Sequence, residues 1–126
     1  MTALTKEMME LVQNEHLAFV ATSSNEGIPN VSPKGSISVV DDKRVVFAEI
    51  ASPHTITNLK ENPKVSLYVL NAQDKKGFQA KGTAELVENG PRFDAVSDAL
   101  KKMMPNLPPT RYAVYIAIDE VYPYGF

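Results

Sequence analysis

The chain has 126 residues, a formal net charge of −2 and no cysteine. Because domains commonly hold about 100–200 residues, we expect one domain spanning residues 1–126 with a single core. The slightly acidic balance argues against a nucleic-acid-binding protein, which needs a basic surface. Without cysteine there is no disulfide, no thiolate metal site and no thiol catalysis.

The sequence contains no recognisable membrane or export signal. It has no run of about 18 apolar residues, and its N-terminal residues lack the pattern of a signal peptide. We therefore expect a cytoplasmic protein with no membrane partner.

The first part of the chain predicts a helix followed by strands. Thr5 is placed to cap a helix over about residues 5–14. Residues 17–22 are apolar almost throughout and predict a buried central strand. The stretch 30–50 predicts two strands joined by a turn at Asp41-Asp42.

A short second helix is predicted to start at Ser52-Pro53, since serine is a good N-cap and proline suits the first helical position. It should end before Asn62-Pro63, because proline disfavours helical geometry in the preceding residue. The remaining elements are predicted from periodicity: strands over 64–70 and 78–87, a helix over 90–104 capped by Asn89, and a last strand over 112–118.

Six strands joined mostly by hairpins, with three helices, indicate a mainly β protein. The expected architecture is a six-stranded antiparallel split β-barrel with peripheral helices.

The common motifs of catalysis are absent. There is no glycine-rich nucleotide loop, and neither a zinc-protease nor a serine-hydrolase motif is present. The two histidines, His16 and His54, are far apart and lack metal-ligand spacing. No metal site is predicted, and no side chain is identified as catalytic.

The predicted helix start at Ser52 has the properties of an anion site. Free backbone N–H groups and the helix dipole favour anions there, and His54 and Thr55 are placed to hold a phosphate. The simpler alternative is that Ser52 only caps the helix and that its neighbours are solvated.

A second unusual segment is Ser32-Pro33-Lys34-Gly35-Ser36. Proline and glycine are unfavourable in a central strand, so this segment predicts an edge, a bulge or a close approach to a ligand. Lys34 would bring a positive charge toward an anionic or carbonyl-bearing ligand. The alternative is an ordinary irregular edge strand.

The order and spacing of several segments resemble the FMN-binding split barrels related to pyridoxamine phosphate oxidase. The most specific of them is Asn62-Pro63-Lys64-Val65-Ser66. The others, individually weaker, are spread over most of the chain: Phe19–Thr22, Val31–Ser36, Val45–Ala48, His54–Thr55, Leu59–Leu67 and Gly77–Ala84.

The resemblance implies that FMN is bound, with its phosphate at the start of the short helix. Relatives usually have an Arg-Lys or Lys-Thr pair where this chain has His54-Thr55, and a neutral imidazole is a weaker phosphate partner. The implied cofactor-binding residues fall into two groups: those beside the isoalloxazine ring, Ser32, Pro33, Lys34, Gly35, Phe47, Ala48 and Glu49, and those at the phosphate end, Ser52, His54, Thr55 and Asn58.

The resemblance also implies a homodimer with the flavin in a cleft between subunits. The aromatic tail Tyr122–Phe126 would reach this cleft or be a frayed terminus. True pyridoxamine phosphate oxidases carry basic substrate-binding residues near the C-terminus, which this chain lacks, so vitamin B6 oxidation is not predicted.

The resulting hypothesis is an FMN-binding redox protein, an oxidoreductase that acts on an unidentified small substrate. Two alternatives stay open at this point. One is a non-catalytic FMN carrier or electron-transfer module. The other is a split barrel that binds a deazaflavin, haem or no cofactor.

Overall fold

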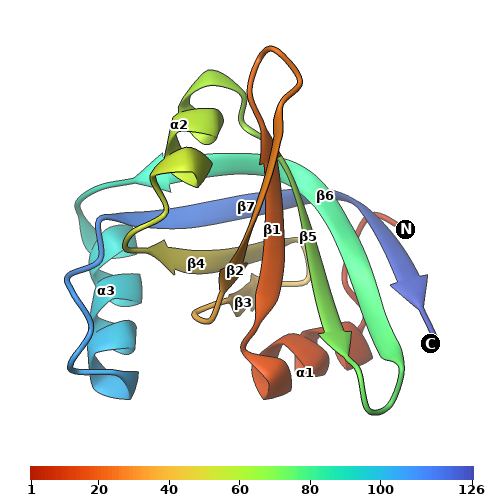
Figure 1. Cartoon of the computed structure of the whole chain (residues 1–126). Helices are drawn as coiled ribbons and strands as arrows, with labels where there is room; N and C mark the ends of the chain where they lie inside the picture. Colours follow the sequence, from red (N-terminus) through yellow and green to blue (C-terminus); the bar gives the residue numbers. More distant parts are fainter.

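The computed structural model describes residues 1–126 as one curled antiparallel sheet with three helices around it (Figure 1). The strands follow the spatial order β2-β1-β5-β6-β7-β4-β3. The end strands β2 and β3 are not paired with each other, so the sheet does not close. The elements are, in chain order, α1 (Lys6–Glu15), β1 (Ala18–Ser23), β2 (Pro29–Lys34), β3 (Ser38–Asp41), β4 (Arg44–Glu49), α2 (Pro53–Glu61), β5 (Lys64–Asn71), β6 (Lys76–Val87), α3 (Pro91–Met103) and β7 (Tyr112–Tyr124).

The mainly β class with peripheral helices is confirmed, but there are seven strands rather than six. The predicted first strand of the stretch 30–50 is two strands. β2 pairs with β1, whereas β3 pairs with β4 at the opposite end of the sheet. Residues 35–37 connect β2 at one edge of the sheet to β3 at the other edge, and the Ile37 side chain is buried in the core. Gly35 and Ser36, which have low strand propensity, therefore mark a chain crossing.

The N-cap residues predicted from the sequence are confirmed for two of the three helices. Thr5 caps α1, accepting a hydrogen bond from the Met8 N–H at 3.2 Å. The predicted cap at Asn89 is wrong, because Gly90 occupies the N-cap position of α3 with φ of 90°. Glycine adopts this left-handed backbone region without the steric cost that other residues incur.

The last strand extends beyond the predicted residue 118 to Tyr124. β7 pairs with β4 only as far as Ala117, and with β6 from Ala113 to Tyr124. Val121 directs its N–H away from β6, to the Met1 carbonyl. Pro123, two residues further on, faces the same way, so its missing N–H does not interrupt the pairing with β6. At Gly82 the β6–β7 register shifts by one residue, which forms a bulge.

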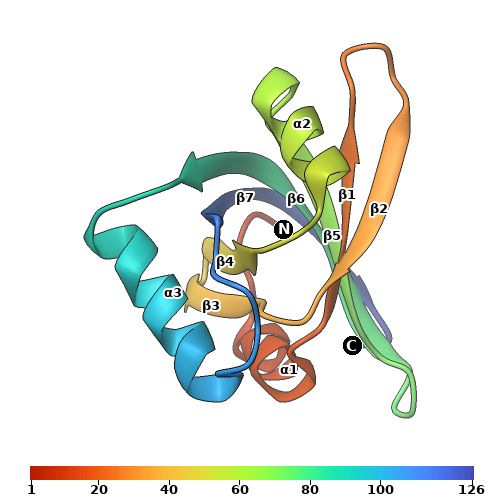
Figure 2. The same cartoon turned by 60° about the vertical axis from the view of Figure 1, so that its left-hand side comes forward.

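The helices cover different parts of the sheet (Figure 2). α1 packs its buried Met8, Leu11 and Val12 against the core. α2 lies over β1 and β2, while α3 lies against β4 and β7. No helix in the structure is long and apolar enough to cross a membrane.

Candidate functional site

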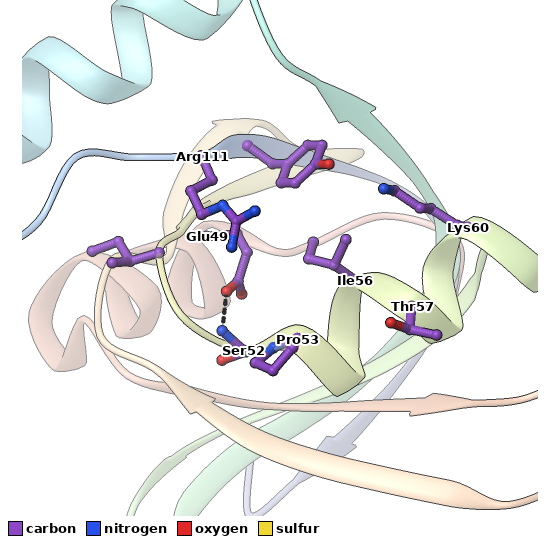
Figure 3. A pocket seen from close by; sticks show the side chains of 9 residues that line it. Glu49, Ser52, Pro53, Ile56, Thr57, Lys60 and Arg111 are labelled. Carbon is purple, nitrogen blue, oxygen red and sulfur yellow. Dashed lines mark hydrogen bonds between the residues drawn. The ribbon is translucent and has the colours of Figure 1, made fainter.

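A buried ion pair lies where β2, β4 and α2 meet. Lys34 ends β2 and Glu49 ends β4, and their residues are only 5% and 1% exposed. The Lys34 Nζ lies 2.5 Å from the Glu49 Oε1 and donates to the Ser52 Oγ at 2.5 Å. The other Glu49 oxygen accepts the Ser52 N–H (Figure 3). Isolated charges are costly to bury, so their mutual pairing is what allows this arrangement.

Ser52 occupies the N-cap position of α2, as predicted, but its hydroxyl makes no capping bond. The Lys34 ammonium uses that hydroxyl as an acceptor instead. The Lys34 ammonium donates to both Glu49 and Ser52, and an ammonium has no lone pair with which to take the proton of the serine hydroxyl. The Ser52–Lys34 contact is therefore not an activated nucleophile of the kind found in hydrolases.

The predicted phosphate-end residues point in different directions. Thr55 is fully buried, and its hydroxyl lies 3.0 Å from the Ser32 hydroxyl of β2 and accepts from Asn30 Nδ2 at 3.3 Å. The His54 side chain is exposed. The Asn58 amide turns to β1, where it donates to the Thr22 Oγ1 at 3.1 Å.

The first turn of α2 leaves backbone donors available beside the Ser32–Thr55 hydroxyl pair. The first bond to the N-cap carbonyl is the one from Ile56 N–H to Ser52, at 3.2 Å. The N–H groups of His54 and Thr55 precede it and have no helical acceptor, as at any helix start. These donors fit a phosphate. The one buried cation nearby, Lys34, is already neutralised by Glu49, so the site offers hydrogen bonds rather than free charge.

Next to the ion pair is a cavity of about 220 Å³, which collects several residues predicted to lie beside the ring. Its polar end contains Lys34 and Ser52. Its lining is completed by Pro33, Gly35, Ser36, Ala48, Ile50, Ala51, Leu100, Met104 and Leu107. Phe47 does not line it, because its side chain is wholly buried in the core.

Sequence reasoning missed several residues that hold this site together. Asn30 and Thr22 supply partners for Thr55 and Asn58. Ser36 bridges to β4, accepting from the Ala48 N–H at 2.9 Å. The sequence did contain a signal for Asn30. It lies two residues before Ser32 and four before Lys34, and alternate residues of a strand share one face. Ser36 and Thr22 carry no comparable signal.

Residues 4–124 match the profile of the family described as pyridoxamine 5′-phosphate oxidase. An uncharacterized protein from Methanocaldococcus jannaschii is 38% identical over 121 residues, which cover 94% of this chain and 79% of that protein. The crystal structure of HupZ from Group A Streptococcus is similar at a TM-score of 0.86 and 27% identity, covering 95% of this chain and 93% of that one. The chain therefore belongs to the pyridoxamine 5′-phosphate oxidase family.

More distant structures share the fold alone, and their names differ in the cofactor they mention. An FMN-binding protein from Syntrophomonas wolfei has a TM-score of 0.82 at 18% identity, covering 94% of this chain and 84% of that one. An F420 reductase and HutZ, described as the haem storage protein of Vibrio cholerae, have TM-scores of 0.72 and 0.69 at 15% and 21% identity, and each covers more than nine-tenths of both chains.

Proposed function

We propose that this protein binds FMN and works as a flavin-dependent redox protein. The observation that carries the proposal is the start of α2, where the N–H groups of His54 and Thr55, which have no helical acceptor, lie beside the partly buried Ser32–Thr55 hydroxyl pair. Backbone donors at a helix start bind phosphate groups through hydrogen bonds and the helix dipole. His54 is exposed, and its imidazole would supply a further donor to a phosphate bound there.

The adjoining cavity would receive the ring end of the cofactor. Lys34 uses two of its three ammonium donors on Glu49 and Ser52, which leaves one for a ligand oxygen or nitrogen. Bound FMN would supply the redox chemistry, while the protein positions it and excludes competing reactions. The acceptor or donor that exchanges electrons with it would be a small molecule.

The family membership supports this proposal, and the same fold occurs in a protein named as FMN-binding. Two other cofactors are considered because structures named for F420 and haem also share the fold. The start of α2 distinguishes FMN from haem, because its backbone N–H donors fit the phosphate that FMN carries, whereas a haem presents carboxylates. FMN is therefore the first cofactor to test.

The test is the visible absorbance of the purified protein followed by titration with FMN. We expect a saturable change in flavin fluorescence, weakened at least about tenfold in a His54→Ala/Thr55→Val double variant, because hydrogen bonds to a charged group are lost. Valine keeps the volume of the buried threonine. Ser97→Ala, which removes a buried hydroxyl on α3, should bind as the unmodified protein does. Equal affinity in the double variant would place the phosphate elsewhere, and a protein that binds F420 or haem but not FMN would reject the proposal.

In this proposal a second subunit completes the flavin site, because the cavity in one chain is too small for the whole cofactor. The cavity of about 220 Å³ is smaller than the roughly 300 Å³ at which cofactor-sized pockets begin. The outer face of β1 and β2 carries Phe19 and Val31, which are 48% and 65% exposed. Phe19 lies opposite Pro33 on one side and Tyr68 on the other. A continuous apolar sheet face of this kind marks an association surface.

We expect the protein to be a homodimer through this face. Val31→Asp should shift the molar mass, measured by light scattering, from two 13.9 kDa chains to one, because a buried unpaired carboxylate is strongly unfavourable. Val40→Asp, at an exposed apolar residue of the edge strand β3, should leave the dimer intact. A monomeric unmodified protein, or a Val31→Asp dimer, would contradict this assignment.

A further inference from the structure

An apolar groove of about 260 Å³ lies between α3 and the strands β3 and β4, next to which α3 stands in Figure 2. Its floor consists of the buried residues Ile37, Val46 and Ala48. Nine of its twelve lining residues are hydrophobic, and none is an aspartate, glutamate, lysine or arginine. Because an ionised group is costly to bury without a partner, such a groove suits an uncharged ligand.

The wall that α3 contributes is made of small or flexible side chains. Ala95, Ala99 and Met103 follow one another at four-residue spacing, so they lie along one face of the helix. The two alanines are exposed, and Met103 is 56% exposed. The alanines leave space that a larger side chain would fill, and a methionine can adapt its shape to a ligand.

The polar side chains of the groove are few, and two of them already have partners. The Ser36 hydroxyl donates to the Ala48 carbonyl at 3.2 Å and accepts from the Ala48 N–H at 2.9 Å. The Tyr115 hydroxyl donates to a backbone carbonyl of α3 at 2.8 Å. Ser38 and His16 are exposed and form the polar rim. They would serve a single polar group on a ligand whose remainder is apolar.

The groove adjoins the cavity that contains Lys34 and that would receive the ring end of FMN. Ser36, Ala48 and Leu100 line both spaces. The exposed Met104, which follows the last residue of α3, lines the cavity as well. A molecule in the groove would therefore lie beside the flavin ring, where the redox partner of a flavin has to be.

We propose that the groove holds the apolar part of the small molecule that exchanges electrons with the flavin, and that this part carries no charge. The inference rests on the proposed flavin function. Since an apolar cavity of about 150 Å³ binds benzene, a volume of about 260 Å³ admits a ligand of about two fused rings. Its polar group would face Ser38 and His16, and ligands with a carboxylate or phosphate in the groove would be disfavoured.

The test compares 2-naphthol with 2-naphthoate, which share one ring system and differ in charge. Each is titrated into ¹⁵N-labelled protein and followed by NMR, first without FMN and then with saturating FMN. We expect saturable shifts at the amides of Ser38, Ala95 and Ala99 with 2-naphthol in both conditions. Binding of 2-naphthoate should be at least about tenfold weaker, because the groove supplies no cation for its carboxylate.

A variant that fills the groove tests its position. Ala99→Leu places a larger side chain in the space and should remove the saturable shifts caused by 2-naphthol. The protein should still fold, because residue 99 is exposed rather than part of the core. Lys102→Leu adds a leucine at an exposed position of α3 outside the lining, so it is the matched control and should bind 2-naphthol as the unmodified protein does.

Four results would overturn the inference: no saturable shift with 2-naphthol, equal affinity for the two probes, unchanged 2-naphthol binding in Ala99→Leu, or displacement of 2-naphthol by FMN. The last would assign the groove to the cofactor itself. A titration with FMN alone tests the flavin proposal separately. If 2-naphthol binds as expected and FMN does not bind at all, the flavin proposal and the redox role of the ligand fail, and the groove stands as a site for neutral ring compounds.

Discussion

Replacing Lys34 with methionine should lower the free energy of unfolding by about 3–5 kcal/mol, measured by urea denaturation. This is the cost of leaving a charged group buried without its partner. Glu49 is 1% exposed, and both of its oxygens are bonded within the cluster. Without Lys34 its carboxylate would keep only the Ser52 N–H, and Ser52 would lose the partner of its hydroxyl.

The double variant Lys34→Met/Glu49→Leu tests the cause of that loss. Because it removes both charges, it should regain most of the stability, as buried ion pairs replaced by apolar residues often do. Arg92→Met is the exposed control, because Arg92 pairs with Glu85 at the surface and lowers the pKa of that carboxyl through hydrogen bonds. It should cost no more than about 1 kcal/mol. A small loss in Lys34→Met would show that Glu49 finds water or another partner.

Gly82→Ala should destabilise the protein by at least about 3 kcal/mol, the upper end of the range for overpacking. A Cβ at this position would overlap the backbone carbonyl of Ala117 on the neighbouring strand. The obstacle is main chain rather than a flexible side chain, so relief requires separating β6 from β7 at their bulge. Urea or thermal unfolding of the purified variant measures the effect.

Gly35→Ala is the matched control for this prediction. The nearest heavy atom to an added Cβ there, the His16 carbonyl oxygen, is 4.0 Å away. Gly35 does not have the positive φ that penalises other residues, so alanine should change stability by less than about 1 kcal/mol. Similar stabilities for the two variants would mean that the close approach at Gly82 is relaxed in solution.

The elements that local chemistry specifies could be predicted from the sequence. Ser52-Pro53 starts α2 and Asn62-Pro63 follows its end, because capping and proline geometry act within a few residues. The split of the first predicted strand of 30–50 into β2 and β3 was missed, since it depends on which distant strand each part pairs with. Strand pairing over long sequence distances leaves no comparable local pattern.

The candidate site likewise has one part that the sequence predicts and another that only the tertiary structure reveals. Its location at the start of α2 follows from residues next to each other in sequence and from the family resemblance. The pairing of Lys34 with Glu49 joins residues fifteen positions apart, and either side chain alone would be expected on the surface. Ser38 and Ala99 line the same groove only because α3 lies against β4. Such juxtapositions require the tertiary structure.

The central place of β7 has a consequence for how the chain folds during synthesis. β4 and β6 each present an unpaired strand edge until residues 112–124 arrive between them, and unpaired edges promote aggregation. The earlier strands β1, β2 and β5 can already pair while the ribosome is still making α3. The two halves of the sheet can therefore join only after β7 has been made, and chaperone binding would be most useful before then.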